Sequence, residues 1–153
     1  RELEAKVQKN MDDGTEPVSF AIVICDLNNL KRINDTLGHK AGDEYIQASC
    51  RLIFDTFSHS PVFRIGGDEF CSIINNAEPQ DLIDRLQNVT AQMSREDYDT
   101  FQCPYQIAAG AATFVKGRDT SFEDVFNRAD KAMYENKRAL KAKDKENGVQ
   151  SSR

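Results

Sequence analysis

The chain has 153 residues, 39% hydrophobic and 29% charged, a composition typical of one soluble globular domain. Its 25 acidic residues outnumber the 20 lysines and arginines, and this net charge of −5 disfavours binding to a nucleic-acid polymer. No apolar run approaches the roughly 20 residues that a membrane-spanning helix needs. Cys25 and Cys71 lie in apolar runs without a C-x-x-C pair, which predicts buried thiols in a reducing, cytoplasmic compartment.

The first 17 residues are predicted to be the end of a connecting helix and a linker. Residues 1–12 are highly charged, with Leu3 and Val7 one helical turn apart, and Pro17 breaks the pattern. We expect this helix to lead back to a sensor domain that the chain omits. The alternative is a frayed helix that packs on the domain itself. The sequence leaves open whether the longer protein is anchored to a membrane.

The next segment predicts a strand followed by two helices. Residues 20–25 form a continuous apolar run rich in β-branched side chains, typical of a central strand covered on both faces. Apolar residues at helical spacing predict a helix over 30–37, ended by Gly38. The same spacing from Tyr45 to Phe57 predicts a second, longer helix, with Asp43 at its start.

Residues 62–74 predict a hairpin, because paired glycines that tolerate positive φ separate two short apolar runs. Pro79 suits the first turn of a third helix. Residues 107–115 predict a strand of mainly small side chains, and Thr120 with Glu123 predicts a capping box for the last helix.

The chain is therefore expected to contain one folded domain over residues 18–141, with a disordered polar tail over 142–153. The element order predicts an α+β fold with a ferredoxin-like βαββαβ core and a mostly antiparallel sheet flanked by helices. Right-handed crossovers place the third strand between the first two and antiparallel to both. Asp26, at the end of the first strand, should then lie beside the turn that contains Asp68 and Glu69.

Three carboxylates that converge on one point repel each other unless a cation lies among them. Hard oxygen ligands suit Mg²⁺ or Mn²⁺, which polarise phosphoryl groups. Gly66 and Gly67 would let the backbone approach phosphates closely. The alternative interpretation is a plain hairpin with a polar tip beside a strand-end aspartate.

Three stretches resemble the motifs of GGDEF domains, the diguanylate cyclases, in order and spacing. They are CDLNNLKRINDTLGHKAGDEYI (25–46), RIGGDEF (64–70) and NRADKAMYENKRALK (127–141). The resemblance covers residues 18 to about 141. It implies a palm-like fold related to polymerases and nucleotide cyclases, in agreement with the topology above. It also implies condensation of two GTP molecules into cyclic di-GMP with release of two pyrophosphates.

The resemblance implies a metal site at the predicted carboxylate cluster. Asp26 matches a metal-binding aspartate, and Leu27 matches the residue that offers its backbone carbonyl to the metal. Asp68 matches the other metal ligand and the proposed proton acceptor for the attacking 3′-hydroxyl. Glu69 matches the position that supports the second metal or the nucleotide geometry. We expect two Mg²⁺ or Mn²⁺ ions per site during catalysis.

The resemblance also implies a guanine-binding pair. Asn34 and Asp43 match the guanine readers, and an aspartate can accept two N–H bonds from the N1/N2 edge of the base. Adenine would leave the same pair unsatisfied, at a cost in binding free energy. From the residues alone, the alternatives are a solvated helix position for Asn34 and a helix N-terminal charge for Asp43.

Three lysines match positions that bind or stabilise the triphosphate. Lys31 matches a lysine that stabilises charge on the triphosphate, and Lys137 matches the lysine for the β- and γ-phosphates. Lys141 lies where many members have arginine, and it follows Lys137 by one helical turn. The alternative for the last two is a solvated basic helix end. A lysine offers a point charge in place of a bidentate fork.

The chain departs from the family pattern at several positions. Asn28 stands where many members have a second aspartate, which removes a negative charge near the metal. Phe57 and Ser60 stand where the arginine and aspartate of the product-inhibition motif would lie, so we predict that this primary inhibitory site is absent. His39 is interpreted as a structural residue of the helix–helix turn.

The predicted function is that of a diguanylate cyclase acting as a transient homodimer. Each domain would hold one GTP, and each 3′-hydroxyl would attack the α-phosphate of the facing nucleotide. The first alternative is a catalytically silent module that binds GTP or cyclic di-GMP and regulates a neighbouring domain. The second is a cyclase that makes a mononucleotide or hybrid product.

Overall fold

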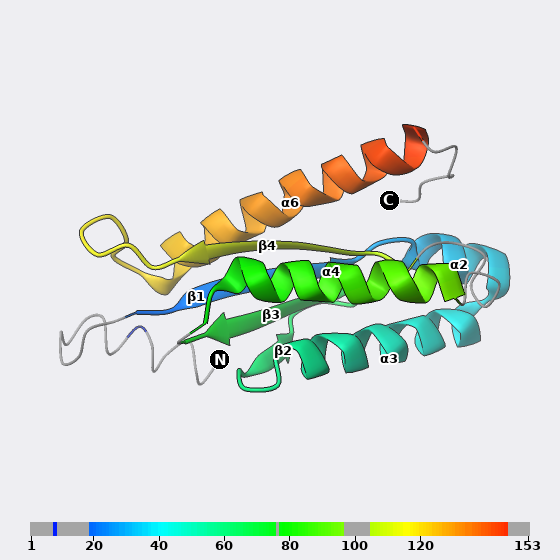
Figure 1. The fold of residues 1–153 in the computed structure, drawn as a ribbon, viewed down its shortest axis with the longest axis horizontal. Helices are drawn as coiled ribbons and strands as arrows, with labels where there is room; N and C mark the ends of the chain where they lie inside the picture. Colours follow the sequence, from blue (N-terminus) through cyan, green and yellow to red (C-terminus); the bar gives the residue numbers. More distant parts are fainter. Residues whose placement is uncertain (1–7, 9–18, 76, 97–104, 147–153) are drawn as a thin grey trace.

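The structure is a computed structural model that describes residue 8 and residues 19–75, 77–96 and 105–146. Figure 1 shows the elements β1 (Ala21–Leu27), α2 (Leu30–Leu37), α3 (His39–Thr56), β2 (Val62–Arg64), β3 (Glu69–Ile74), α4 (Pro79–Glu96), β4 (Ile107–Thr113) and α6 (Phe122–Glu146). Apart from Gln8, the predicted connecting helix lies outside the described residues. No helix in the described segments is long and apolar enough to cross a membrane.

The four strands form one sheet in the order β2-β3-β1-β4, with every neighbouring pair antiparallel. The third strand of the chain therefore lies between the first two, as the crossover rule predicts. The pairing of β1 with β3 sets Asp26 opposite Glu69. The predicted α+β fold with a βαββαβ core is confirmed.

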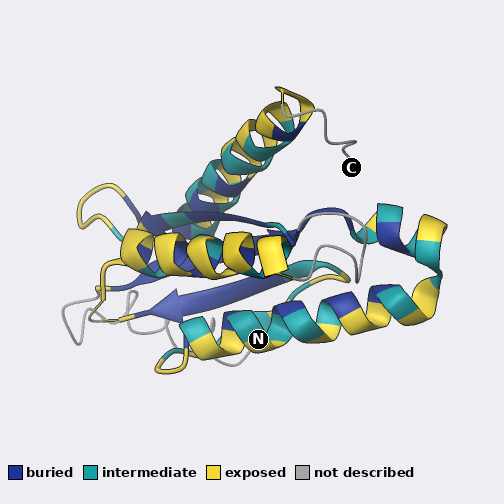
Figure 2. Cartoon of the chain, turned by 45° about the vertical axis from the view of Figure 1, so that its right-hand side comes forward, coloured by how far each residue is buried: buried dark blue, intermediate teal, exposed yellow. Residues whose placement is uncertain are grey.

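Helices cover both faces of the sheet (Figures 1 and 2). Alternate side chains of β1 supply the two cores. Val23 and Cys25 pack with buried residues of α2, α3 and α4. Ile22 and Ile24 pack with buried residues of α6. Every residue of β1 is buried, as expected for a central strand covered on both sides.

Helix α6 lies unusually close to β4, because Gly110 has no side chain. A Cβ atom built at Gly110 would lie 2.0 Å from the backbone nitrogen of Met133. This close approach brings α6 down onto the sheet and sets the position of the polar residues on its later turns. A larger residue at position 110 would push the helix away.

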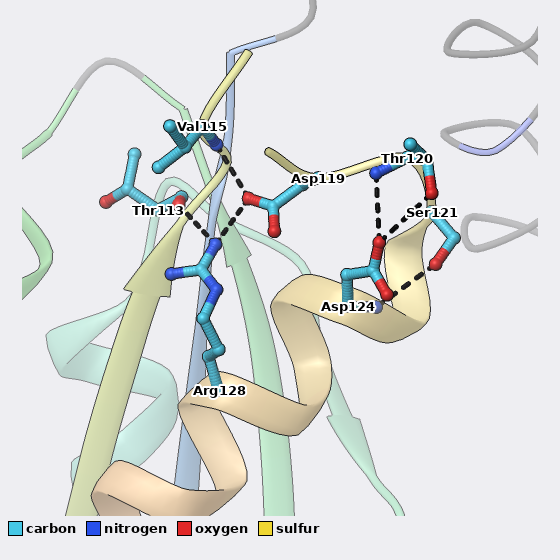
Figure 3. A network of polar contacts seen from close by, with 7 residues as sticks. All are labelled: Thr113, Val115, Asp119, Thr120, Ser121, Asp124 and Arg128. Atoms are coloured by element: carbon cyan, nitrogen blue, oxygen red, sulfur yellow. Dashed lines mark hydrogen bonds and ion pairs between the residues drawn. The ribbon is translucent and has the colours of Figure 1, made fainter. Parts of the chain in front are cut away.

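The start of α6 differs from the predicted capping box by one residue (Figure 3). The Asp124 N–H donates to Ser121 Oγ over 3.2 Å, and Asp124 Oδ2 accepts from the Thr120 N–H over 2.9 Å. The cap therefore uses Ser121 and Asp124 in place of Thr120 and Glu123. The backbone hydrogen bond from Thr120 is the main cause that lowers the pKa of Asp124.

A second polar contact ties the loop before α6 to the sheet (Figure 3). Arg128 forms an ion pair with the buried Asp119 and donates to the Thr113 carbonyl over 2.9 Å. Asp119 Oδ2 also accepts from the Val115 N–H over 2.7 Å. The connection between β4 and α6 is thus held at both ends.

Three further predictions need correction. Helix α3 begins at His39, so Asp43, which was predicted at the start of this helix, lies in its second turn. Helix α6 continues to Glu146, so residues 142–146 are helical where a disordered tail was predicted. The hairpin at Gly66 and Gly67 is confirmed, but neither glycine is among the described residues with positive φ, the conformation that the prediction invoked.

Candidate active site

The end of β1 and the β2–β3 turn meet at one edge of the sheet. Asp26 pairs with Glu69 in the β1–β3 register, and the Leu27 N–H donates to the Asp68 carbonyl over 2.9 Å. Antiparallel partners project to the same face, so the Asp26 and Glu69 side chains lie on the face that α6 covers. The structure thus brings together the three carboxylates that the topology predicted to converge.

Asp26 is the most buried of these carboxylates, with 6% of its surface exposed. Its Oδ2 accepts from Lys137 Nζ over 2.8 Å, whereas its buried Oδ1 has no hydrogen-bond partner. Burial raises the pKa of Asp26, and Asp68 beside it adds to this effect, while the Lys137 ammonium opposes it. Burial thus outweighs the ion pair, and the orphaned oxygen offers a position for a cation.

Glu69 and Asp130 extend the acidic cluster towards α6. Burial is the main cause that raises the pKa of Glu69, and the negative charges of Asp26, Asp130 and Asp68 raise it further. The Lys137 ammonium lowers the same pKa. Sequence reasoning missed Asp130, which precedes Lys137 by two helical turns and therefore shares its face. This spacing within the last motif is the signal that could have found it.

The carboxylates at this sheet edge supply only part of the ligand set that a divalent ion needs. Among residues 19–75, 77–96 and 105–146, no three Asp, Glu, His or Cys side chains are arranged as a ready set of metal ligands. Mg²⁺ commonly binds through one or two carboxylates, with waters and substrate phosphates completing its shell. Asp26, with its partnerless oxygen, and the adjacent Asp68 fit that mode of binding.

The glycine turn is held by Arg64, to which sequence reasoning gave no role. Its guanidinium donates to the carbonyls of Gly66 and Gly67, over 3.2 Å and 2.6 Å. Both glycines are exposed, although the Gly66 N–H already donates to the Glu69 carbonyl over 3.4 Å. A Cβ at Gly66 would lie 3.7 Å from Glu69 Oε2, which places the Glu69 carboxylate beside the turn.

The two predicted guanine readers lie in α2 and α3, on either side of the corner where Gly38 adopts a φ of 93°. A Cβ at Gly42 would lie 1.7 Å from Asn34 Oδ1, so the Asn34 side chain rests directly on the backbone of α3. Asp43 is the next residue and is exposed. The missing side chain of Gly42 thus lets Asn34 pack on the backbone of α3, one residue before Asp43.

The three predicted phosphate lysines have different positions. Lys137 is in the ion pair with Asp26. Lys141 is half-buried one turn later in α6, and Lys31 is exposed in the first turn of α2. Lys137 therefore lies within the carboxylate cluster itself.

Asn28 and Phe57, two departures from the family pattern, both belong to the interior. Asn28 has 1% of its surface exposed, and its Nδ2 donates to Gln106 Oε1 over 2.7 Å. Its amide therefore points towards β4. Phe57 is buried in the core beneath α3, and Ser60 is half-buried in the loop that follows.

Comparison with known proteins decides the family. The family model described as "Diguanylate cyclase, GGDEF domain" matches residues 1–143. The chain belongs to the GGDEF diguanylate cyclase family. The family match covers most of the chain and includes the carboxylate edge, the α2–α3 corner and Lys137.

This GGDEF domain is similar to curated diguanylate cyclases of Escherichia coli strain K12. It is 30% identical to "Probable diguanylate cyclase DgcJ" over 89% of this chain and 26% of that protein. It is 29% identical to "Diguanylate cyclase DosC" over 78% of this chain and 26% of that protein. The chain therefore spans about a quarter of the length of these two relatives.

Solved GGDEF structures confirm the fold. The active GGEEF domain of a Vibrio cholerae diguanylate cyclase matches with a TM-score of 0.75 and 26% identity, over 91% of this chain and 90% of that one. The GGDEF domain of DgcB from Caulobacter crescentus, in complex with c-di-GMP, matches with a TM-score of 0.71 and 25% identity, over 90% and 81%.

Proposed function

We propose that this GGDEF domain is an active, metal-dependent diguanylate cyclase that condenses two GTP molecules into cyclic di-GMP across a transient homodimer. The observation that carries the proposal is the meeting of Asp26, Asp68 and Glu69 at one sheet edge, with a buried Asp26 oxygen left without a partner. Lys137 balances one of these three negative charges, and the charge that remains favours a divalent cation during function.

The metal would be held by Asp26, Asp68 and the Leu27 carbonyl, with Glu69 supporting a second ion or the nucleotide. When bound, Mg²⁺ or Mn²⁺ would polarise the α-phosphate and lower the pKa of the 3′-hydroxyl. Asp68, in the turn, would accept the proton of that hydroxyl as it attacks the facing nucleotide.

The remaining residues would bind the nucleotide. Asn34 and Asp43 would read the guanine edge from the α2–α3 corner. The exposed backbone of the Gly66–Gly67 turn would approach the phosphates. Lys137 and Lys141 would contact the β- and γ-phosphates, and Lys31 would balance charge on the triphosphate. These contacts would orient one GTP, but its 3′-hydroxyl reaches an α-phosphate only when a second domain faces it.

The proposed partners and location follow from this mechanism. A second copy of the domain would complete the site, and an upstream sensor domain would control how often two copies meet. The free cysteines Cys25, Cys50 and Cys71 suit a cytoplasmic location, where thiols stay reduced. The folded catalytic unit is proposed to cover residues 18–141 together with the last turn of α6.

One observation favours a second candidate, a silent module that binds GTP or cyclic di-GMP. Asn28 replaces an acidic residue near the metal, and its buried amide is engaged with Gln106. This substitution leaves fewer negative charges to attract a metal. The complete Gly66-Gly67-Asp68-Glu69 turn favours the enzyme.

The experiment is incubation of the purified domain with GTP and Mg²⁺, followed by chromatography and mass spectrometry of the nucleotides. The enzyme yields cyclic di-GMP and pyrophosphate, and its specific activity rises with protein concentration because two domains must meet. GTP binding without product at micromolar protein would identify the silent module. A mixture of ATP and GTP tests for a hybrid product, and specific activity that stays constant on dilution would refute the facing-domain mechanism.

A further inference from the structure

Three side chains far apart in sequence form a directional chain of hydrogen bonds inside the domain. Asn28 Nδ2 donates to Gln106 Oε1 over 2.7 Å, and Gln106 Nε2 donates to Asp144 Oδ2 over 3.1 Å. Asn28 and Asp144 have 1% and 8% of their surfaces exposed. This hydrogen-bond chain links the residue after β1 to the residue before β4 and to the last turns of α6.

The direction of the hydrogen-bond chain follows from chemistry. An ionised Asp144 can only accept hydrogen bonds, so Gln106 must present its NH₂ group to that carboxylate. The Gln106 carbonyl oxygen then faces position 28, which must supply a donor. An asparagine supplies it, whereas an ionised aspartate cannot. The amide at position 28 is therefore matched to the acid at position 144.

The backbone of residue 28 is held at the same place. The Asn28 N–H donates to the Gln106 carbonyl over 2.9 Å, and Tyr45 Oη donates to the Asn28 carbonyl over 2.7 Å. The next residue, Asn29, has the left-handed φ of 72° and is the N-cap of α2. Contacts from α3 and from the start of β4 thus fix the loop that directly follows Asp26 and Leu27.

We propose that Asn28, Gln106 and Asp144 are positioning residues, which fix the loop after the metal-binding end of β1 and tie it to the last turns of α6. The proposal rests on the proposed function for the metal-binding role of Asp26 and Leu27. It connects Asn28 Nδ2 to Asp144 through Gln106, while the buried Asn28 Oδ1 has no hydrogen-bond partner. It also gives residues 142–146 a role in the folded domain.

The test is a cycle of three variants: Asn28→Asp, Asp144→Asn and the double variant. In Asn28→Asp two carboxylates compete for one Gln106 NH₂ group, and we expect a loss in melting temperature on the order of 5 °C at about pH 8. Asp144→Asn alone keeps an acceptor and should change little. In the double variant the Gln106 amide can turn over and donate to the new carboxylate at position 28, so the melting temperature should return to within about 2 °C of the original.

A matched control separates this hydrogen-bond chain from a general charge effect. Glu146→Gln removes one negative charge from the same end of α6, at an exposed position outside the hydrogen-bond chain. When Glu146→Gln is combined with Asn28→Asp, the melting temperature should not recover. Equal recovery of the melting temperature with Asp144→Asn and with Glu146→Gln would overturn the proposal. An Asn28→Asp variant as stable as the original protein would also overturn it.

The second readout is the binding of Mn²⁺ to the nucleotide-free variants, measured by electron paramagnetic resonance. A positioning role predicts weaker binding in Asn28→Asp, by about 3-fold or more, and recovery in the double variant. Tighter binding in Asn28→Asp would show that position 28 is a ligand position and would overturn the proposal. The melting cycle needs neither metal nor nucleotide, so it stands even if the domain makes no cyclic di-GMP.

Discussion

Lys137 Nζ lies 2.8 Å from Asp26 Oδ2, and the two residues join α6 to β1 across 111 positions of the sequence. Both side chains are mostly buried. Without nucleotide or metal, the ammonium of Lys137 is the charge that balances Asp26 beside Asp68 and Glu69. The proposed phosphate-binding lysine therefore first serves as a counterion for the proposed metal ligand.

Loss of this counterion should make the domain more dependent on divalent ions for stability. We expect Lys137→Met to lower the unfolding free energy by roughly 1–3 kcal/mol without metal, because Asp26 remains buried without a cation. Mg²⁺ should restore more stability to this variant than to the original protein. Urea unfolding with and without Mg²⁺ measures both effects. Lys131→Met, exposed on the same helix, is the control, and an equal response to Mg²⁺ in both variants would contradict the counterion role.

Asp68 should be essential for turnover but not for folding. We expect Asp68→Asn to slow cyclic di-GMP formation by about 100-fold or more, because the amide can neither accept the hydroxyl proton nor bind metal as a carboxylate does. The residue is half-buried in a turn, so the circular dichroism spectrum should not change. Asp55→Asn, at an exposed position of α3, serves as the control. Turnover within a few-fold of the original would remove Asp68 from the mechanism.

The carboxylate edge could be predicted from sequence because it depends on topology and on local patterns. The apolar run of β1 and the glycine pair of the hairpin fix which strands are neighbours, and the register then brings Asp26 opposite Glu69. Only the order of elements and a handedness rule are needed. The reason given for the glycines was wrong, since their backbone does not need positive φ.

Features that depend on contacts between distant residues could not be predicted. Asp144 looks like part of a solvated tail until Gln106, 38 positions away, is seen to donate to it. Asp130 resembles any charged residue on a helix surface until α6 is placed over β4 and β1. The cap of α6 was misplaced by one residue, because Thr120 and Ser121 are both good capping residues and only the fold selects between them.

Gly42 should control guanine binding through Asn34. Alanine at position 42 would place its Cβ 1.7 Å from the present position of Asn34 Oδ1, which must then move. Because the clash is with the end of a flexible side chain, the helix should survive and gain from its higher propensity. We expect the KM for GTP to rise about 10-fold in Gly42→Ala, as buried polar contacts to the base are lost.

The matching experiment is a double-mutant cycle with Asn34→Ala. If Gly42→Ala acts by displacing Asn34, adding Gly42→Ala to Asn34→Ala should raise KM no further. Additive effects would show that Gly42 acts by another route.

Asp43→Ala, at an exposed position, should also weaken GTP binding with little change in melting temperature.

Cys25 should make the domain less stable in alkaline solution. Burial raises the pKa of its thiol from 9.0 to about 12, with smaller contributions from Cys71 and Asp26. Below about pH 9 the thiol is protonated in both the folded and unfolded states, so it adds no pH dependence there. Between about pH 9 and 12 only the unfolded chain loses the proton. The unfolding free energy should then fall by up to about 1.4 kcal/mol per pH unit from this group alone.

Urea unfolding between about pH 8 and pH 10.5 measures this slope, and Cys25→Ala isolates the contribution of the thiol. Alanine leaves a small cavity and lowers stability at every pH, but its curve should be flatter above about pH 9. Cys50→Ala is the matched control, because the Cys50 thiol is only half-buried and should contribute a smaller slope. Strand β1, which carries Cys25, lies between β3 and β4, so ionising this thiol in the folded domain would bury a charge. Parallel curves for Cys25→Ala and the original protein would contradict this prediction, because they would mean that the thiol ionises as readily in the folded domain as in the unfolded chain.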